Sequence, residues 1–170
     1  RSLTQKDIEL LMDVTEQSIE RPKRGQKTFY SGKKKRHTVK TEVRTTLEGK
    51  ITHVSKTHPG TVHDFALYKQ ETPLPKEAHV YVDSGYQGLQ KRHLKTEVPF
   101  KKSKDNPLSL EDKCYNRALS RIRVKVEHVF AQIKTFKIMS ERFRNKRKRY
   151  NLKFKIIAGI VNLKNGFEPI

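Results

Sequence analysis

The sequence predicts an α/β fold, a mixed β-sheet with helices packed against it. Residues Thr38–Thr45 alternate polar with β-branched side chains, a pattern typical of a half-exposed strand. Residues Val80–Val82 form a short β-favouring run that ends at an acid and glycines, as a buried strand does. Between residues 110 and 136 apolar side chains recur at three- and four-residue steps, which indicates a long amphipathic helix.

The N-terminal part predicts one strand followed by a long basic segment. Residues Ile8–Thr15 open the domain, and Val14 and Thr15 favour a strand with Asp13 near its end. The stretch Glu16–Arg36 is rich in Lys and Arg and is interrupted by proline and glycine. We therefore expect this stretch to be an exposed loop or hairpin.

A hairpin and several short elements are expected in the middle of the chain. Residues Ile51–Thr57 return alongside Thr38–Thr45 after a glycine turn. Residues Thr61–Tyr68 predict a helix with the first threonine as its N-cap. A short helix at Leu89–Leu94 and a strand at Val98–Lys102 follow the Val80 strand.

The C-terminal third predicts two helices joined by a basic bend. After a loop at Ser103–Ser109, the long helix begins near Leu110; the bend spans Arg142–Arg149, and the last helix covers Asn151–Leu163. The apolar stripes are expected at Ala118, Ile122, Val126, Val129, Phe130, Ile133 and Phe136 on the first helix, and at Phe154, Ile157, Ile160 and Val161 on the second.

Length and charge restrict the classes of function. The 170 residues are long enough for one domain with a proper core, and we expect residues 1–170 to be a single domain. The formal net charge of +20 indicates a polyanionic partner, nucleic acid first and an anionic membrane surface second. No apolar run approaches the roughly 20 residues that span a bilayer, and Arg1–Asp7 has no apolar signal core. Cys114 is the only cysteine, which excludes a disulfide framework.

Three acids are candidates for the chemistry. Asp13 and Asp83 lie near the ends of predicted strands, and Glu127 borders the apolar stripe of the long helix. Burying a carboxylate away from water is costly unless a positive group lies beside it, so an acid next to a buried stripe indicates a positively charged partner. If the three converge, they form an oxygen cage that suits Mg²⁺ or Mn²⁺, and two such ions can cleave a phosphodiester.

Structural explanations stay open for the same residues. Asp83 is equally well placed to cap a helix over Leu89–Leu94. The spacing of Arg123, Glu127 and Lys134 puts them on one helix face, where an ordinary surface ion-pair ladder is the alternative.

Two basic runs, each flanked by aromatic residues, predict phosphate contacts, although a solvated face is the usual explanation of such runs. His63 and Asp64, before the predicted central helix, either support the acids or serve as a packed histidine and a helix cap. The predicted DNA-binding residues are Lys33, Lys34, Lys35, Arg36, Arg123, Lys134, Arg142, Arg144, Lys146 and Arg147.

Several motifs together resemble a known family. They are Met12–Glu16, Arg21–Pro22, Gly60–Asp64, Val82–Gly88 and the set Arg123, Glu127 and Lys134. The last set fits a signature of Tyr, two residues, Arg, three residues, Glu, six residues and Lys, except that Ser120 replaces the tyrosine. From Leu10 to Phe167 the chain resembles the catalytic domain of DDE transposases of the bacterial insertion-sequence-five group and its Harbinger-like relatives.

The resemblance implies an RNase H-like fold and a metal-dependent triad of Asp13, Asp83 and Glu127. It implies Mg²⁺ or Mn²⁺, two ions, and double-stranded DNA as the partner, cut at transposon ends and joined to target DNA. We further expect a homo-oligomer on DNA, no membrane association, a cytoplasmic location at the bacterial nucleoid or a nuclear one in a eukaryote, and an N-terminal DNA-binding domain outside these residues. The alternatives are a non-catalytic DNA-binding protein with the same scaffold and a stand-alone metal-dependent endonuclease.

Overall fold

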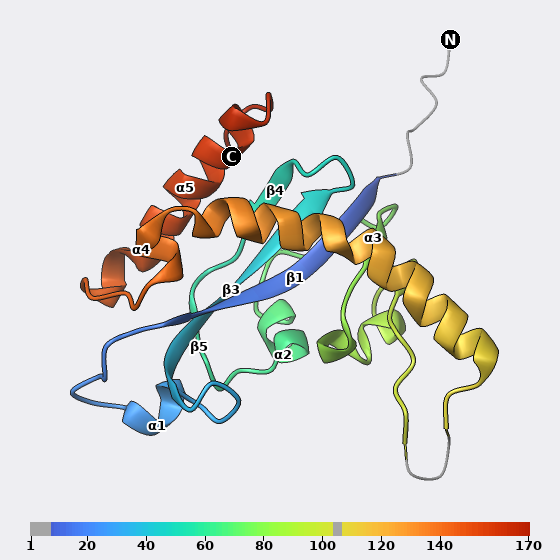
Figure 1. Ribbon diagram of the computed structural model, residues 1–170, viewed down its shortest axis with the longest axis horizontal. Coiled ribbons are helices and arrows are strands. Elements are labelled where there is room, and N and C mark those ends of the chain that lie inside the picture. Colours follow the sequence, from blue (N-terminus) through green and yellow to red (C-terminus); the bar gives the residue numbers. More distant parts are fainter. Residues whose placement is uncertain (1–7, 104–106) are drawn as a thin grey trace.

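The computed structural model describes residues 8–103 and 107–170. The expectations for residues 1–7, and for residues 104–106 of the predicted loop, lie outside the described residues. Figure 1 shows a twisted sheet with the long helix α3 (Leu110–Lys134) lying across one face and α5 (Tyr150–Lys164) on the same side. The short helix α2 (Asp64–Tyr68) lies on the opposite face. The predicted α/β architecture is confirmed, and it is consistent with an RNase H-like fold.

The sheet mixes parallel and antiparallel pairing in the order β2-β3-β1-β6-β7, with β4 and β5 also paired to β3. The central strand β1 runs antiparallel to β3, from Leu10 opposite Thr46 to Ser18 opposite Thr38, and parallel to β6. The strands are β1 Glu9–Ser18, β2 Tyr30–Ser31, β3 Arg36–Thr46, β4 Ile51–Val54, β5 His58–Pro59, β6 His79–Tyr81 and β7 Thr96–Glu97.

The predicted start of α3 is confirmed, and its cause is local. Ser109 Oγ accepts a hydrogen bond from the Asp112 backbone N–H at 3.0 Å, and Asp112 Oδ2 accepts one from Ser109 N–H at 2.9 Å. This capping box satisfies two backbone donors at the helix start. The remaining helices are α1 Gln26–Phe29 and α4 Lys137–Ser140, with 3₁₀ turns at Ser84–Tyr86, Leu89–Lys91 and Arg147–Arg149.

Alternation along β1 divides the core into two parts. Leu11 faces α3 and α5, where it packs in a cluster with Val126 and Phe154. Leu10 and Met12 face the other side, where they join the residues around α2 and the turn that follows β6. Because successive side chains of a strand point to opposite faces, Asp13 lies on the same face as Leu11, under α3.

The N-terminal prediction was wrong in extent. Strand β1 continues to Ser18 because its pairing with β3 continues that far, so Asp13 lies in the middle of the strand and not near its end. The stretch Glu16–Arg36 therefore begins as a strand, and it also contains α1 and β2.

Other boundaries also differ from the prediction. Thr61 does not cap α2: its hydroxyl donates to the Thr28 carbonyl at 2.7 Å, and His63 holds the cap position without a side-chain bond. The strand expected at Val98–Lys102 lies earlier in the chain, at Thr96–Glu97, and in the described structure these are the residues of this region that pair with β6.

Four further elements are shorter or rotated. The helix expected over Leu89–Leu94 is a 3₁₀ turn that ends at Lys91, and β4 ends at Val54. Ile160 is 42% exposed, because α5 turns Ala158 toward the core, and Leu119 is buried on α3 where Ala118 was expected.

Candidate active site

Asp13 lies on β1 beneath α3 and meets a cation there. Arg123 Nη2 donates to Asp13 Oδ2 at 3.2 Å, and the Val14 backbone N–H donates to Oδ1 at 2.7 Å. The two paired side chains are only 17% and 18% exposed. This contact joins residues 110 positions apart, so the fold itself brings the arginine of the predicted signature to the first acid.

Asp83 follows β6, the parallel neighbour of β1, and begins the Ser84–Tyr86 turn. Its Oδ1 accepts a hydrogen bond from the Gly85 backbone N–H at 2.5 Å. The capping alternative is therefore correct in kind, although the capped element is this turn and not residues 89–94. Capping fixes one carboxylate oxygen and leaves the second for another partner.

Asp64 lies in the first turn of α2 and approaches Asp83. Lys40 Nζ bonds Asp64 Oδ1 at 3.0 Å and the Val62 carbonyl at 2.8 Å. A Cβ atom on Gly85 would lie 2.5 Å from Asp64 Oδ2 and 2.8 Å from Asp83 Oδ1. The two carboxylates thus crowd the same glycine, and a side chain at this position would force at least one of them to move.

The electrostatics of Asp13 show that these acids act on one another. Burial raises the pKa of Asp13 to about 6, the Arg123 guanidinium and the Val14 N–H oppose this rise, and the negative charges of Asp83 and Asp64 add to it. A raised pKa of a buried carboxylate with a specific charged partner is typical of functional sites. The structure therefore places Asp64, predicted only as a supporting residue, in the same acidic cluster as Asp13 and Asp83.

Glu127 lies one helical turn after Arg123 and is exposed. Among the hydrogen bonds and ion pairs of the described residues, none involves its carboxylate. Arg123 and Lys134 both face β1, the latter in a hollow with Glu16 and Ser18. Helical periodicity therefore puts Glu127 on the flank of α3 that runs along β1.

The carboxylate oxygens of Asp13, Asp64 and Asp83 are chemically suited to bind a hard divalent cation, because Mg²⁺ and Mn²⁺ prefer such ligands. In the described residues no three His, Cys, Asp or Glu side chains gather closely enough to hold an ion as they stand. Each carboxylate of the cluster has another partner: Arg123 for Asp13, Lys40 for Asp64 and the Gly85 N–H for Asp83.

A buried polar network supports the turn after Asp83. Glu42 on β3 is fully buried, and its Oε1 lies 2.9 Å from Arg44 Nε, itself only 4% exposed. The Tyr86 hydroxyl donates to Glu42 Oε2 at 3.2 Å. Burial raises the pKa of Glu42, and the Arg44 charge opposes that rise. Sequence reasoning missed this network, since alternation along Thr38–Thr45 indicated a strand with one exposed face.

The predicted DNA contacts are spread over several places. Lys34, Arg36 and Lys134 line one hollow of about 270 Å³. Lys146 and Arg147 line a different cleft, and Arg123 pairs with Asp13. The residues Lys33, Lys35, Arg142 and Arg144 are exposed. His63 is exposed too, so its packed-core alternative is wrong.

Comparison with known proteins decides the family. The sequence model described as DDE superfamily endonuclease matches residues 12–162, which include Asp13, Asp83 and Glu127. The chain belongs to the DDE superfamily endonucleases. It is 43% identical over 156 residues to the probable transposase for insertion sequence element IS702 of Microchaete diplosiphon. That alignment covers 90% of this chain and 56% of the relative, so the chain spans little more than half of the relative's length. No solved structure gives a significant match.

Membership in the DDE family implies a nuclease that depends on divalent metal and acts on DNA. The strong positive charge agrees with such a substrate. Within residues 8–103 and 107–170, no helix has the length and apolar character needed to cross a membrane.

Proposed function

We propose that the chain is the catalytic domain of a DNA transposase, which hydrolyses phosphodiester bonds at transposon ends and transfers the freed strand into target DNA. The observation that carries this proposal is the junction of β1, β6, α2 and α3. There the negative charges of Asp83 and Asp64 raise the pKa of Asp13, and the cations paired with these acids in the described structure are Arg123, with Asp13, and Lys40, with Asp64.

We assign the metal ligands as Asp13, Asp83 and Glu127. When bound, two Mg²⁺ or Mn²⁺ ions supply activation of a water or 3′-hydroxyl and stabilise the leaving oxygen. The residues of the chain prepare this site. Arg123 keeps Asp13 from becoming still more basic, and the Gly85 N–H orients Asp83.

Two features support Glu127 as the third ligand. It follows Arg123 by one turn on the flank of α3 beside β1, and its exposed carboxylate has no competing partner among the described residues. The side chain is therefore free to turn toward the ions. Asp64 remains a supporting acid in this assignment, because Lys40 neutralises it.

The DNA is double-stranded and comprises both the transposon ends and the target. We propose that the domain, a single unit over residues 1–170, works as a homo-oligomer on this DNA. We assign recognition of the transposon ends to an N-terminal domain outside these residues. The protein is proposed to act at the bacterial nucleoid, or in the nucleus if the source is eukaryotic. The non-catalytic alternative is not favoured, because the acids are present and the chain matches a nuclease family.

The test is Mg²⁺-dependent cleavage and joining by purified wild-type and Asp83→Asn proteins. We expect the variant to lose both activities while it keeps its fold and DNA affinity, because only the ligand charge is removed. A pre-cut end with a free 3′-hydroxyl separates the transposase from a plain endonuclease, since only the transposase yields joined product. Cleavage by the Asp83→Asn protein at the wild-type rate would contradict the assignment.

A further inference from the structure

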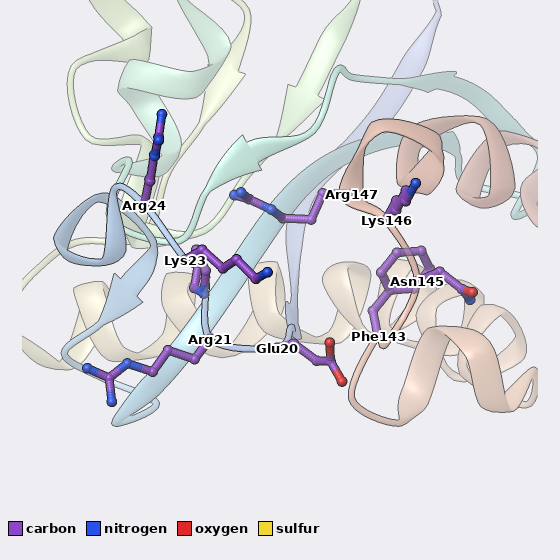
Figure 2. Close-up of a pocket in the computed structure, with 9 residues that line it drawn as sticks. Glu20, Arg21, Lys23, Arg24, Phe143, Asn145, Lys146 and Arg147 are labelled. Atoms are coloured by element: carbon purple, nitrogen blue, oxygen red, sulfur yellow. The ribbon is translucent and has the colours of Figure 1, made fainter.

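A basic cleft of about 490 Å³ lies beyond the carboxyl end of β1 (Figure 2), and none of Asp13, Asp64 and Asp83 lines it. Its two walls are residues 20–24, which follow β1, and residues 143–147, which follow α4. The walls are joined by backbone contacts. Phe143 N–H donates to the Ser18 carbonyl at 2.8 Å, and Ile19 pairs with Phe143 as a parallel bridge. The cleft is therefore part of the folded structure.

The charge of this cleft is not balanced within the protein. Five of its lining residues are cations, against one acid, Glu20. The ion pairs of the described residues include none of these cations, which are Arg21, Lys23, Arg24, Lys146 and Arg147. Like charges held together in a concave surface attract anions strongly.

Neighbouring contacts fix two of these cations in place. The Arg147 guanidinium lies 4.1 Å from the centre of the Phe29 ring, a cation–π contact. Arg21 Nε donates to Gln26 Oε1 at 2.9 Å. Arginine positioned in this way keeps its other N–H groups for bidentate binding of phosphate. Figure 2 shows Lys146 and Arg147 on one wall and Arg21, Lys23 and Arg24 on the other.

We infer that this cleft binds the phosphate backbone of DNA, at a place separate from the phosphodiester bond that is cut at Asp13 and Asp83. The inference rests on the proposed function in taking DNA as the polyanion. Seven residue steps lead from Asp13 to Glu20, five of them within β1, a span of at most about 23 Å at ~3.3 Å per step. That span equals about seven base pairs at ~3.4 Å each, so one duplex is long enough to contact both places. Backbone contacts of this kind position DNA and carry no sequence preference.

The test measures binding of a fluorescent duplex of about 30 base pairs by anisotropy in EDTA, over a salt series. The cleft variant is Lys23→Gln with Arg24→Gln and Lys146→Gln. Its matched control removes two lysines and one arginine elsewhere, by Lys76→Gln with Lys91→Gln and Arg92→Gln. All six side chains are exposed, and circular dichroism checks that both proteins keep the wild-type melting temperature.

We expect the cleft variant to bind at least about tenfold more weakly near 0.1 M salt, because three phosphate contacts are lost. The slope of log K against log salt should become shallower by about 2 to 3, and the control should stay near the wild-type slope. Equal losses in the two variants, or no loss in the cleft variant, would overturn the inference. So would cleft-dependent binding to phosphatidylserine vesicles without cleft-dependent binding to the duplex.

This binding experiment and the Mg²⁺-dependent cleavage assay together separate this inference from the proposed function. Binding in EDTA needs no metal, and the Asp83→Asn protein should show the same cleft-dependent binding as wild type. If cleavage is absent but cleft-dependent binding remains, the transposase proposal fails alone. If cleavage is present and the cleft variant binds like its control, the cleft assignment fails alone.

Discussion

Arg123 on α3 bonds Asp13 on β1 at 3.2 Å, across 110 residues of sequence. The same guanidinium has a buried Nε atom without a hydrogen-bond partner in the described structure. Arg123 therefore neutralises Asp13 with only part of its donor capacity.

Replacing Arg123 by Gln should raise the pKa of Asp13 above its present value of about 6, because the nearest opposing positive charge is removed. Carboxyl carbon shifts followed by NMR over a pH series measure this directly. Arg117→Gln, on the exposed surface of the same helix, is the control and should leave the pKa near 6. An unchanged Asp13 titration in the Arg123 variant would show that the ion pair is not formed in solution.

The metal-free protein should lose stability as the pH rises from about 4 to 6. Asp13 has an ordinary pKa of 3.8 and a folded pKa of about 6, so in this window the folded state binds more protons than the unfolded state. The free energy of unfolding therefore falls with rising pH, by up to about 3 kcal/mol for this group.

The variant Asp13→Asn isolates this contribution. It should raise the melting temperature relative to wild type at pH 7.5 and do so less at pH 4.5, where the wild-type carboxyl is already protonated. Thermal melts in EDTA at both pH values are the measurement. A variant that is destabilised more at pH 7.5 than at pH 4.5 would contradict the raised pKa.

Replacing Gly85 by Ala should impair the site more than the fold. The new Cβ would meet Asp64 Oδ2 and Asp83 Oδ1, so at least one carboxylate must move. Gly32→Ala, where the added Cβ meets nothing within 4 Å, is the matched control. We expect cleavage at least about tenfold slower for Gly85→Ala alone, since misplaced catalytic groups cost that much or more. Wild-type cleavage by Gly85→Ala would show that the two carboxylates tolerate displacement.

Replacing only one partner of the buried Glu42–Arg44 ion pair, which supports the Ser84–Tyr86 turn, should be costly to stability. Arg44→Gln leaves Glu42 buried without its cation and should destabilise the fold by about 3–5 kcal/mol. Adding Glu42→Gln should recover part of this loss, because the unpaired charge is then removed. Urea unfolding of the two single variants and the double variant measures the coupling. Strictly additive losses would mean that the two residues do not act as a pair.

Local signals predicted much of the fold. The strand at Thr38–Thr45, the strand before Asp83 and the start of α3 at Leu110 each have their cause in neighbouring residues, whether β-branched alternation, glycine punctuation or a serine cap. The extent of β1 was not predictable in this way. Its last residues, Glu16–Ser18, are polar, and they are strand because β3 pairs with them from distant sequence.

The acids assigned to the site stood out in the sequence, whereas the residues that contact them did not. Asp13 and Asp83 stood out because each interrupts an apolar or β-favouring run, and the spacing of Arg123 and Glu127 placed them on one helix face. The closeness of Asp64 to Asp83 has no such signal, since it depends on how α2 packs against the turn after β6. The Glu42–Arg44 pair was missed for the same reason, because only the tertiary fold buries that strand on both faces.

Calorimetric titration with Mn²⁺ tests the central claim most directly, using wild-type protein, Asp83→Asn and Glu127→Gln, with Glu111→Gln on the same helix as the control. If Asp13, Asp83 and Glu127 hold the metal, the wild-type protein and the Glu111→Gln control bind Mn²⁺ with the same affinity. Asp83→Asn then loses Mn²⁺ binding, and Glu127→Gln binds Mn²⁺ at least about tenfold more weakly, because one ligand charge is removed. Mn²⁺ binding of wild-type strength by both Asp83→Asn and Glu127→Gln would contradict the account.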